Sequence, residues 1–434
     1  MSSTTLPYPS RPHPVYTRWR RAACATVAAL ACGIASIASA QTEGNFETPP
    51  TLKVGELVAK DLLQGKGLTV EEKVPTDGIM GIYTIKADKA TFGEDAGSYQ
   101  VRSRELLELR LAEVPAILQL NDTSKLGTFA KSMGATAVRP LEATGHMVMN
   151  PIDTVTGLPS GVGRLFDRVG SGVGRAVGSE AVPGSGGEEG GAANAVRDVL
   201  GYEQERRALA KKLGVDPYTS NPILAKKLDD FASAAFYGRV GVNTAISMAV
   251  PASMLLTGVR TIDNLVWDTP RGDLIVRVET KLQELNVTQA QRSLFLHNPA
   301  VPLSLQVAVV ENLDRLKDVK GRQDVIWQVG SVATESQARF LATAVRMLAD
   351  YHEKKPLATV TAPGPILGRD RAGNLIVPMP VDYLSWTERV AFFAKNSELL
   401  AAPQRTLWIT GKMSPRAKTE IVANGWSVSE GTMP

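Results

Sequence analysis

Apolar residues in the N-terminal third first alternate with polar ones and then recur at helical spacing. Residues 81–87 alternate and are rich in β-branched and aromatic side chains, which predicts a strand, and 98–101 predicts a second one in a hairpin. Ser103 then precedes a periodic apolar run typical of a capped helix (Leu107, Leu111, Val114 and Leu118). With a short amphipathic helix expected over 52–63, the pattern predicts a small α+β domain over 42–150.

Beyond the middle of the chain the pattern is helical. Residues 202–213 form a charged periodic stretch, and Pro222 stands at the first position of another. Thr288-x-x-Gln291 and Thr334-x-x-Gln337 have the form of capping boxes, which open two more helices. Antiparallel helix pairs are therefore expected in a helical domain over 196–355. The positions expected to face inward include Leu224, Leu228, Phe231 and Ala235, and then Leu341, Val345 and Leu348.

After Pro356 short strands alternate with helices. Strands are expected over four segments, with the turn sequence Asp370-Arg371-Ala372-Gly373 between the first two (357–361, 374–381, 406–410 and 426–428). Ser385 and Glu388 have capping-box spacing for a helix that reaches about Leu400, and Ser414-Pro415 opens another. The ending predicts a small α/β unit over 356–434.

Glycine concentrates between the first and second predicted domains. Residues 151–195 are expected to form a Gly-rich linker whose first half carries an amphipathic segment. The whole pattern therefore predicts an α+β fold that is predominantly α-helical: an N-terminal β-hairpin plus helix, central helix pairs, and a small C-terminal α/β unit.

The first forty residues have the form of a secretory signal peptide. Arg18, Arg20 and Arg21 precede an uncharged, Ala-rich stretch, and small residues stand at the two positions that signal peptidase requires before a cut between Ala40 and Gln41. An uncleaved membrane anchor and a lipoprotein modified at Cys32 are the alternatives. The expected location is outside the cytoplasm, in the periplasm of a bacterium or else in the extracellular medium.

Removal of this segment changes the charge of the chain. The sequence holds 48 Lys and Arg against 44 Asp and Glu, but four Arg and no acidic residue fall in residues 1–40, which leaves 44 of each. A nucleic-acid-binding protein is expected to keep a positive excess, so that class is disfavoured. Both cysteines, Cys24 and Cys32, also fall in this segment, which disfavours disulfides and thiolate chemistry in the mature chain.

No catalytic or metal-binding motif stands out. His146, His297 and His352 have no metal-ligand spacing, so no metal and no cofactor are expected. Asp382 and Glu388 are weak catalytic candidates, together with His146. Three tryptophans near these acids are weak ligand-binding candidates, since acids flanked by exposed indoles would suit a carbohydrate-acting hydrolase (Trp386, Trp408 and Trp426).

Two segments resemble parts of exported bacterial proteins to which no activity is assigned. These are residues 83–117, which contain YTIKAD and YQVRSRELLELRLAEVPAI, and residues 209–228, LAKKLGVDPYTSNPILAKKL. The resemblance implies export and brings no substrate, cofactor or site.

Three functions remain open on the sequence. The leading hypothesis is an exported binding or scaffold protein whose partner is another protein or an envelope component. The second is a cell-envelope or carbohydrate-acting hydrolase that uses acids near Asp382. The third is a membrane-associated protein, because residues 240–259 lack charge over the length of a bilayer crossing, although Pro251 and several polar residues interrupt them. In that case the Gly-rich amphipathic segment would add a peripheral membrane contact.

Overall fold

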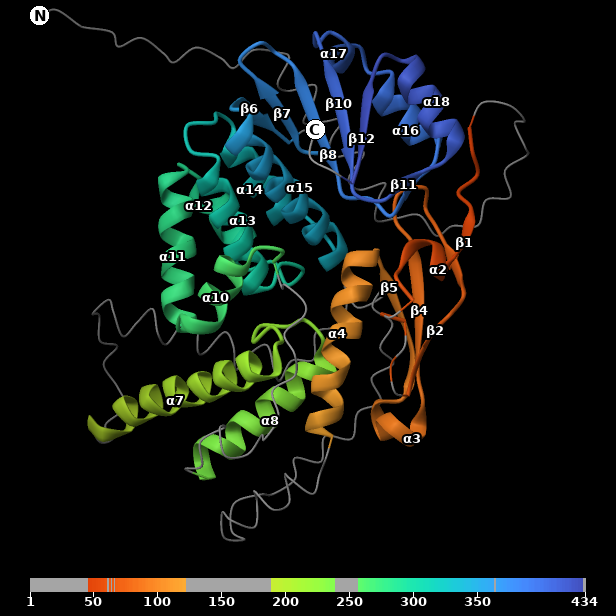
Figure 1. Ribbon diagram of the computed structural model, residues 1–434. Coiled ribbons are helices and arrows are strands. Elements are labelled where there is room, and N and C mark those ends of the chain that lie inside the picture. Colours follow the sequence, from red (N-terminus) through yellow and green to blue (C-terminus); the bar gives the residue numbers. More distant parts are fainter. Residues whose placement is uncertain are drawn as a thin grey trace, which may run out of the picture.

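The computed structural model describes residues 46–121, 189–238 and 257–431, apart from residues 61, 64, 66 and 363. The signal segment, His146, most of the predicted linker and most of the 240–259 segment lie outside the described residues. Among those described, 53% are helical, which confirms the mixed α+β class with a helical majority. Figure 1 shows the C-terminal sheet, the central helices beside it and the N-terminal strands with their long helix.

The N-terminal unit is an antiparallel three-stranded sheet with a long helix. Its sheet has the order β2-β4-β5, and β4 pairs with β5 from Ile82–Arg102 to Ala87–Gly97. The elements are β1 (Thr51–Lys53), α2 (Val54–Leu57), β2 (Leu68–Val70), β3 (Lys73–Pro75), β4 (Ile82–Ala87), α3 (Lys89–Phe92), β5 (Gly97–Arg102) and α4 (Arg104–Leu120). The predicted hairpin and its following helix are confirmed.

The predicted helix over 52–63 is wrong. Residues 51–53 are instead strand β1, which pairs antiparallel with β3, and only α2 is helical. Val58 already has an extended backbone. Strand pairing with a segment about twenty residues further on overrides a short helical pattern of about three turns.

Helix α4 packs against two groups of elements. Its N-terminal half lies on the N-terminal sheet, where Leu107 joins a core with Tyr83, Ile85 and Val101. Its C-terminal half shares a second core with α7 (Glu189–Leu213) and α8 (Pro222–Gly238), through Ile117 and Leu120. The four positions expected to face inward from α8 are all buried. Helix α4 is therefore the element that connects the N-terminal sheet to the α7–α8 pair (Figure 1).

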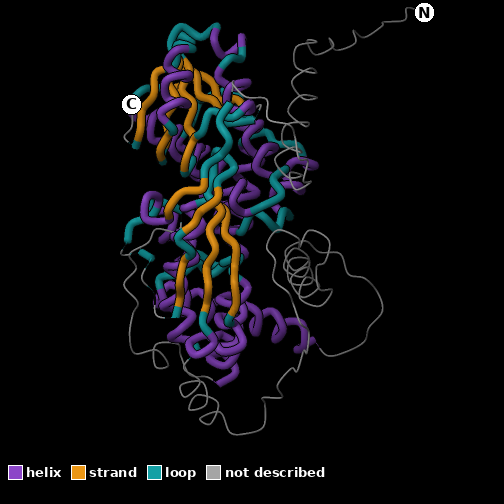
Figure 2. Tube along the Cα trace, turned by 90° about the vertical axis from the view of Figure 1, so that its right-hand side faces the viewer, coloured by secondary structure: helices purple, strands orange, loops and turns teal. Residues whose placement is uncertain are grey.

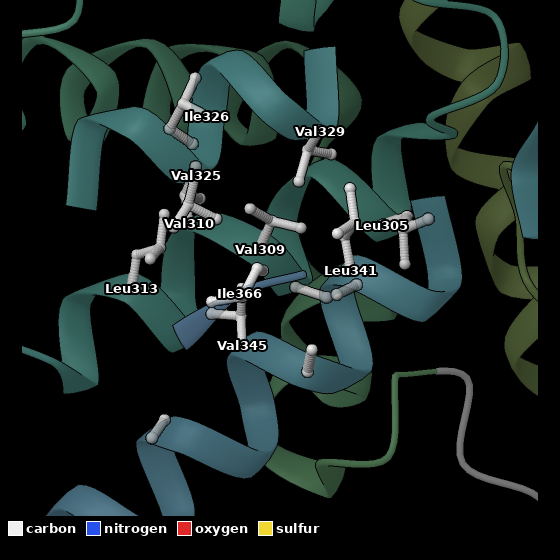
Figure 3. Close-up of a cluster of buried hydrophobic side chains, with 14 of the residues drawn as sticks. Leu305, Val309, Val310, Leu313, Val325, Ile326, Val329, Leu341, Val345 and Ile366 are labelled. Carbon is white, nitrogen blue, oxygen red and sulfur yellow. The ribbon is translucent and has the colours of Figure 1, made fainter. Parts of the chain in front are cut away.

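The six helices from α10 to α15 form a third core with one face of the C-terminal sheet. They are α10 (Arg260–Asp268), α11 (Arg271–Glu284), α12 (Gln289–Leu296), α13 (Leu303–Arg315), α14 (Arg322–Gly330) and α15 (Glu335–Lys354). Both predicted capping boxes are present, at the starts of α12 and α15. Figure 3 shows Val309, Val325, Leu341 and Ile366 meeting in this core from α13, α14, α15 and the chain before β7.

The C-terminal sheet has the order β12-β10-β8-β7-β6, with helices on both faces. Alternate residues of its central strands face opposite layers: Leu375, Val377 and Met379 pack under α16–α18, whereas Ile376 and Trp408 pack on the α13–α15 side. The elements are β6 (Leu357–Thr361), β7 (Leu367–Asp370), β8 (Leu375–Met379), β9 (Tyr383–Leu384), α16 (Glu388–Ala394), α17 (Ser397–Leu400), β10 (Arg405–Ile409), β11 (Lys412–Met413), α18 (Pro415–Ala423) and β12 (Ser427–Glu430).

Two details of this unit differ from the sequence prediction. Strand β7 was not expected, because its sequence LGRD is short and half charged, and it forms between β6 and β8 through antiparallel pairing. Helix α16 is capped by Thr387 rather than by Ser385, and the helix breaks at Lys395, where Asn396 caps α17. The predicted turn at Asp370–Gly373 and the Ser414 cap of α18 are both present.

The three-stranded N-terminal sheet and the five-stranded C-terminal sheet lie at different levels along the molecule, as the side view shows (Figure 2). The segment after β8 connects them, because the backbone N–H groups of Asp382 and Ser385 donate to the carbonyls of Ile79 and Gly78. Glu47 adds a second connection by accepting from the N–H of Trp386 and the hydroxyl of Ser414. The end of β8 is therefore held against the N-terminal unit.

Candidate functional site

A cavity of about 230 Å³ opens where the C-terminal sheet, α4 and α15 meet. Pro380 and Thr410 directly follow β8 and β10, which run parallel, so the cavity lies outside the carboxyl ends of these strands. That is the place where open α/β sheets bind ligands, because the chain leaves each strand there and side chains of different loops converge. The lining residues are Met80, Ser103, Arg104, Glu105, Glu108, Leu109, Thr257, Gly258, Ser336, Arg339, Phe340, Thr343, Arg346, Pro380, Asp382 and Thr410.

Asp382 positions the α4 wall of the cavity. Its carboxylate accepts the backbone N–H groups of Arg104 and Gly81, both at 2.9 Å, and the hydroxyl of Tyr83 at 3.2 Å. Arg104 is the first residue of α4, where unpaired N–H groups and the helix dipole favour a negative charge. Asp382 therefore fixes the start of α4 against the end of β8.

Ser103 completes this junction at the start of α4. Its φ of 85° lies in the left-handed region, and its hydroxyl accepts the N–H of Leu106, as the sequence predicted for a helix cap. Its own N–H donates to the carbonyl of Gly81 at 3.0 Å. The positive φ turns the chain from β5 into α4, so that Arg104, Glu105 and Glu108 face the cavity.

Helix α15 forms the facing wall. Ser336, Arg339, Thr343 and Arg346 are spaced by three, four and three residues, so they share one stripe of the helix. The Thr343 hydroxyl donates to Glu105 at 2.9 Å, which joins the two walls. Gly258, with a φ of 76°, brings the loop before α10 close to Arg346, since a Cβ there would lie 3.0 Å from the Arg346 Nε.

The two walls differ in net charge. Helix α15 contributes Arg339 and Arg346 to the lining, whereas α4 contributes Glu105 and Glu108 beside Arg104. Arg339 is bound by Glu335 at 2.9 Å and lies 4.0 Å from Glu105. The cavity is thus polar and has both signs of charge.

Burial changes the acidity of two carboxyl groups in the lining. Burial raises the pKa of Asp382 from 3.8 to about 6, against the lowering effect of the N–H groups of Gly81 and Arg104. Burial also raises the pKa of Glu108, which Arg104 lowers and Glu105 raises further. Carboxyl groups with raised pKa in a cavity are typical of functional sites.

Of the candidate catalytic and ligand-binding residues named from the sequence, Asp382 alone among those described lines this cavity. Trp386, Trp408 and Trp426 are 1%, 6% and 3% exposed, so these indoles are core side chains with no ring face open to a sugar. The Trp426 indole donates to the Ala394 carbonyl. Glu388 is the first residue of α16, and His146 lies outside the described residues.

The arginines of α15 and the acids of α4 were not predicted as site residues from the sequence. Arg339 and Arg346 lie seven residues apart, on the face of α15 opposite the predicted inward positions, so the pattern indicated a solvated face. That face is covered because α4 folds back onto it. The one signal in the sequence was their seven-residue spacing, which places both arginines on the same face of a helix, two turns apart.

Among the residues that the structure describes, no three His, Cys, Asp or Glu side chains gather into a metal-binding group. In the same part of the chain, no helix is long and apolar enough to cross a membrane. Comparison of the chain with protein-family models, curated proteins and solved structures gives no match.

Proposed function

We propose that this protein is an exported binding protein without catalytic activity, and that the cavity between α4 and α15 is its ligand site. The observation that carries the proposal is a polar cavity at the carboxyl ends of two parallel strands, lined by Arg346, whose Nε has no hydrogen-bond partner among the described residues. The Nε itself is covered, but the Arg346 side chain is 28% exposed, so an anionic ligand in the cavity would accept hydrogen bonds from its outer N–H groups.

The arrangement around the cavity also supports binding more than catalysis. The Asp382 oxygens already accept hydrogen bonds from Gly81, Tyr83 and Arg104, and these groups hold α4 in place. Ser103 is likewise engaged as the cap of α4. Because Asp382 and Ser103 use their polar atoms to hold the cavity walls in place, the arrangement is typical of a preformed ligand pocket.

The hydrolase hypothesis has one observation in its favour. Asp382 and Glu108 line the same cavity, and burial raises the pKa of both, as a general acid requires. The three hydrogen bonds accepted by Asp382 argue for a positioning role instead. Turnover of an ester, glycoside or peptide substrate that is lost in Asp382→Asn, with the fold intact, would establish the hydrolase and refute our proposal.

Filling the cavity tests the binding function directly. Thr343→Phe places a ring between the walls, whereas Thr280→Phe places the same ring on an exposed position of α11. We expect compounds found by thermal-shift screening of a chemically diverse library to lose at least about tenfold in affinity in Thr343→Phe, and to bind Thr280→Phe normally. Equal binding to both variants, or no binder at all in the library, would refute this site.

A further inference from the structure

The charge of Arg346 is only weakly neutralised by the side chains around it. Its nearest carboxylate is Asp350, 3.6 Å from its Nη1, which is too far for a hydrogen bond. Asp350 is itself bound by Arg315 at 2.6 Å. Arg346 therefore shares Asp350 with Arg315, and within the described part of the chain its Nε has no hydrogen-bond partner. An arginine fork in this condition suits a carboxylate, which accepts two parallel N–H groups.

Glu108 is the complementary group on the opposite wall. Its partner Arg104 lies 3.6 Å away, again beyond hydrogen-bond distance, and the side chain is 28% exposed. Burial raises its pKa, so its charge is under-compensated. Glu105 adds a second acid on the same helix. This wall therefore favours a cationic group on a ligand.

The lining as a whole is balanced in charge. Three arginines and three carboxyl groups line the cavity, so a ligand with only one sign of charge would meet repulsion from one wall. Met80, Leu109 and Phe340 supply an apolar part of the same surface. A molecule with one anionic group, one cationic group and a small apolar body matches all of these features.

We propose that the cavity binds a small zwitterion of the α-amino acid class, with its carboxylate on Arg346 and its ammonium group on Glu108. This inference rests on the proposed binding function. The apolar side chain of the ligand lies against Met80, Leu109 and Phe340.

The test uses the mature protein and isothermal titration with each of the twenty free L-amino acids. The best binder is then compared with its amine, which lacks the carboxylate, and with its acid, which lacks the amino group. We expect each of these two compounds to bind at least about tenfold more weakly than the amino acid. If no amino acid binds, or if the acid or the amine binds as tightly as the amino acid, the inference is refuted.

Variants assign the two charges of the ligand. In Arg346→Gln we expect the affinity for the amino acid to fall about tenfold or more, whereas the affinity for its amine, which has no carboxylate, stays the same. In Glu108→Gln we expect the affinity for the amino acid to fall to a similar extent, whereas the affinity for its acid, which has no amino group, stays the same. Arg277→Gln is the matched control, because Arg277 pairs with Glu311 on the exposed side of α11. Equal losses for all three ligands in either variant would overturn the assignment. Binding of uncharged compounds that Thr343→Phe abolishes would refute the zwitterion and leave the proposed binding function intact.

Discussion

Asp382 shows how a single residue can hold two units together. Its carboxyl group lies 5% exposed between the end of β8, the hairpin and the first turn of α4. Burial raises its pKa from 3.8 to about 6. Because the folded-state pKa lies above the unfolded one, the folded protein holds this proton more tightly. The stabilisation is full below about pH 4 and is lost as the pH rises through 6.

The raised pKa of Asp382 predicts how the stability of the protein depends on pH. We expect the unfolding free energy of the wild type, relative to that of Asp382→Asn, to fall by about 2 to 3 kcal/mol from about pH 4 to about pH 7. Urea denaturation at several pH values measures this difference. A difference that grows with pH would mean that the ionised carboxylate, through its contact with the start of α4, is the stabilising form.

At the scale of elements, a group of buried charges joins α4, α15 and the loop before α8. Arg110 on α4 lies 3.1 Å from Glu113 and 2.7 Å from Glu335, and Ser220 also donates to Glu335. Burial would raise the pKa of Glu335, but Arg110 and Arg339 outweigh it and hold the value at about 2. The stability that this carboxylate contributes is therefore present above its usual pKa of 4.5 and is lost as the pH falls through 2.

Removing this charge should therefore weaken the packing of the three elements. We expect Glu335→Gln to lower the unfolding free energy by about 2 to 4 kcal/mol at neutral pH, because two buried arginines lose their shared partner. The loss should shrink as the solution is acidified. Glu430→Gln, which breaks the exposed pair with Lys418, is expected to cost under about 1 kcal/mol. Equal costs for the two variants in urea denaturation would contradict this account.

On the scale of the whole molecule, the chain divides its hydrophobic residues among several cores. One core lies under α16–α18, one joins the sheet to α10–α15, and two more lie along α4. The cavity lies where α4 meets α15 and the strand ends, so its two walls belong to different cores. A ligand bound to both walls would add a contact between these parts of the molecule.

Export is also a property of the whole chain, and it stays a prediction. We expect the protein in the periplasmic fraction with an intact mass that begins at Gln41. Ala40→Phe should block cleavage, because the position before the cut accepts only small side chains, whereas Ser39→Phe should be cleaved normally. A chain that begins at Cys32 with added acyl mass, or an uncleaved protein in the cytosol, would contradict the predicted signal peptide.

The sequence by itself determined the features that depend on neighbouring residues. The Ser103 cap, the two capping boxes, the Asp370–Gly373 turn and the inward face of α8 all formed where the pattern placed them. Each of these depends on hydrogen bonds or side-chain spacing within about one helical turn. The α+β class with a helical majority followed from the sum of such local signals.

Only the tertiary structure decided the sheet orders and the cavity. Strand β1 exists because β3, about twenty residues further on, pairs with it, and β7 because it lies between β6 and β8 in the sheet, although the sequences of β1 and β7 are too short to specify a strand. Asp382 and Arg104 meet across 278 positions of sequence, and Arg346 became a cavity residue because α4 covers a helix face whose pattern indicated solvent. Contacts of this kind depend on how the cores pack together, which no local pattern of residues records.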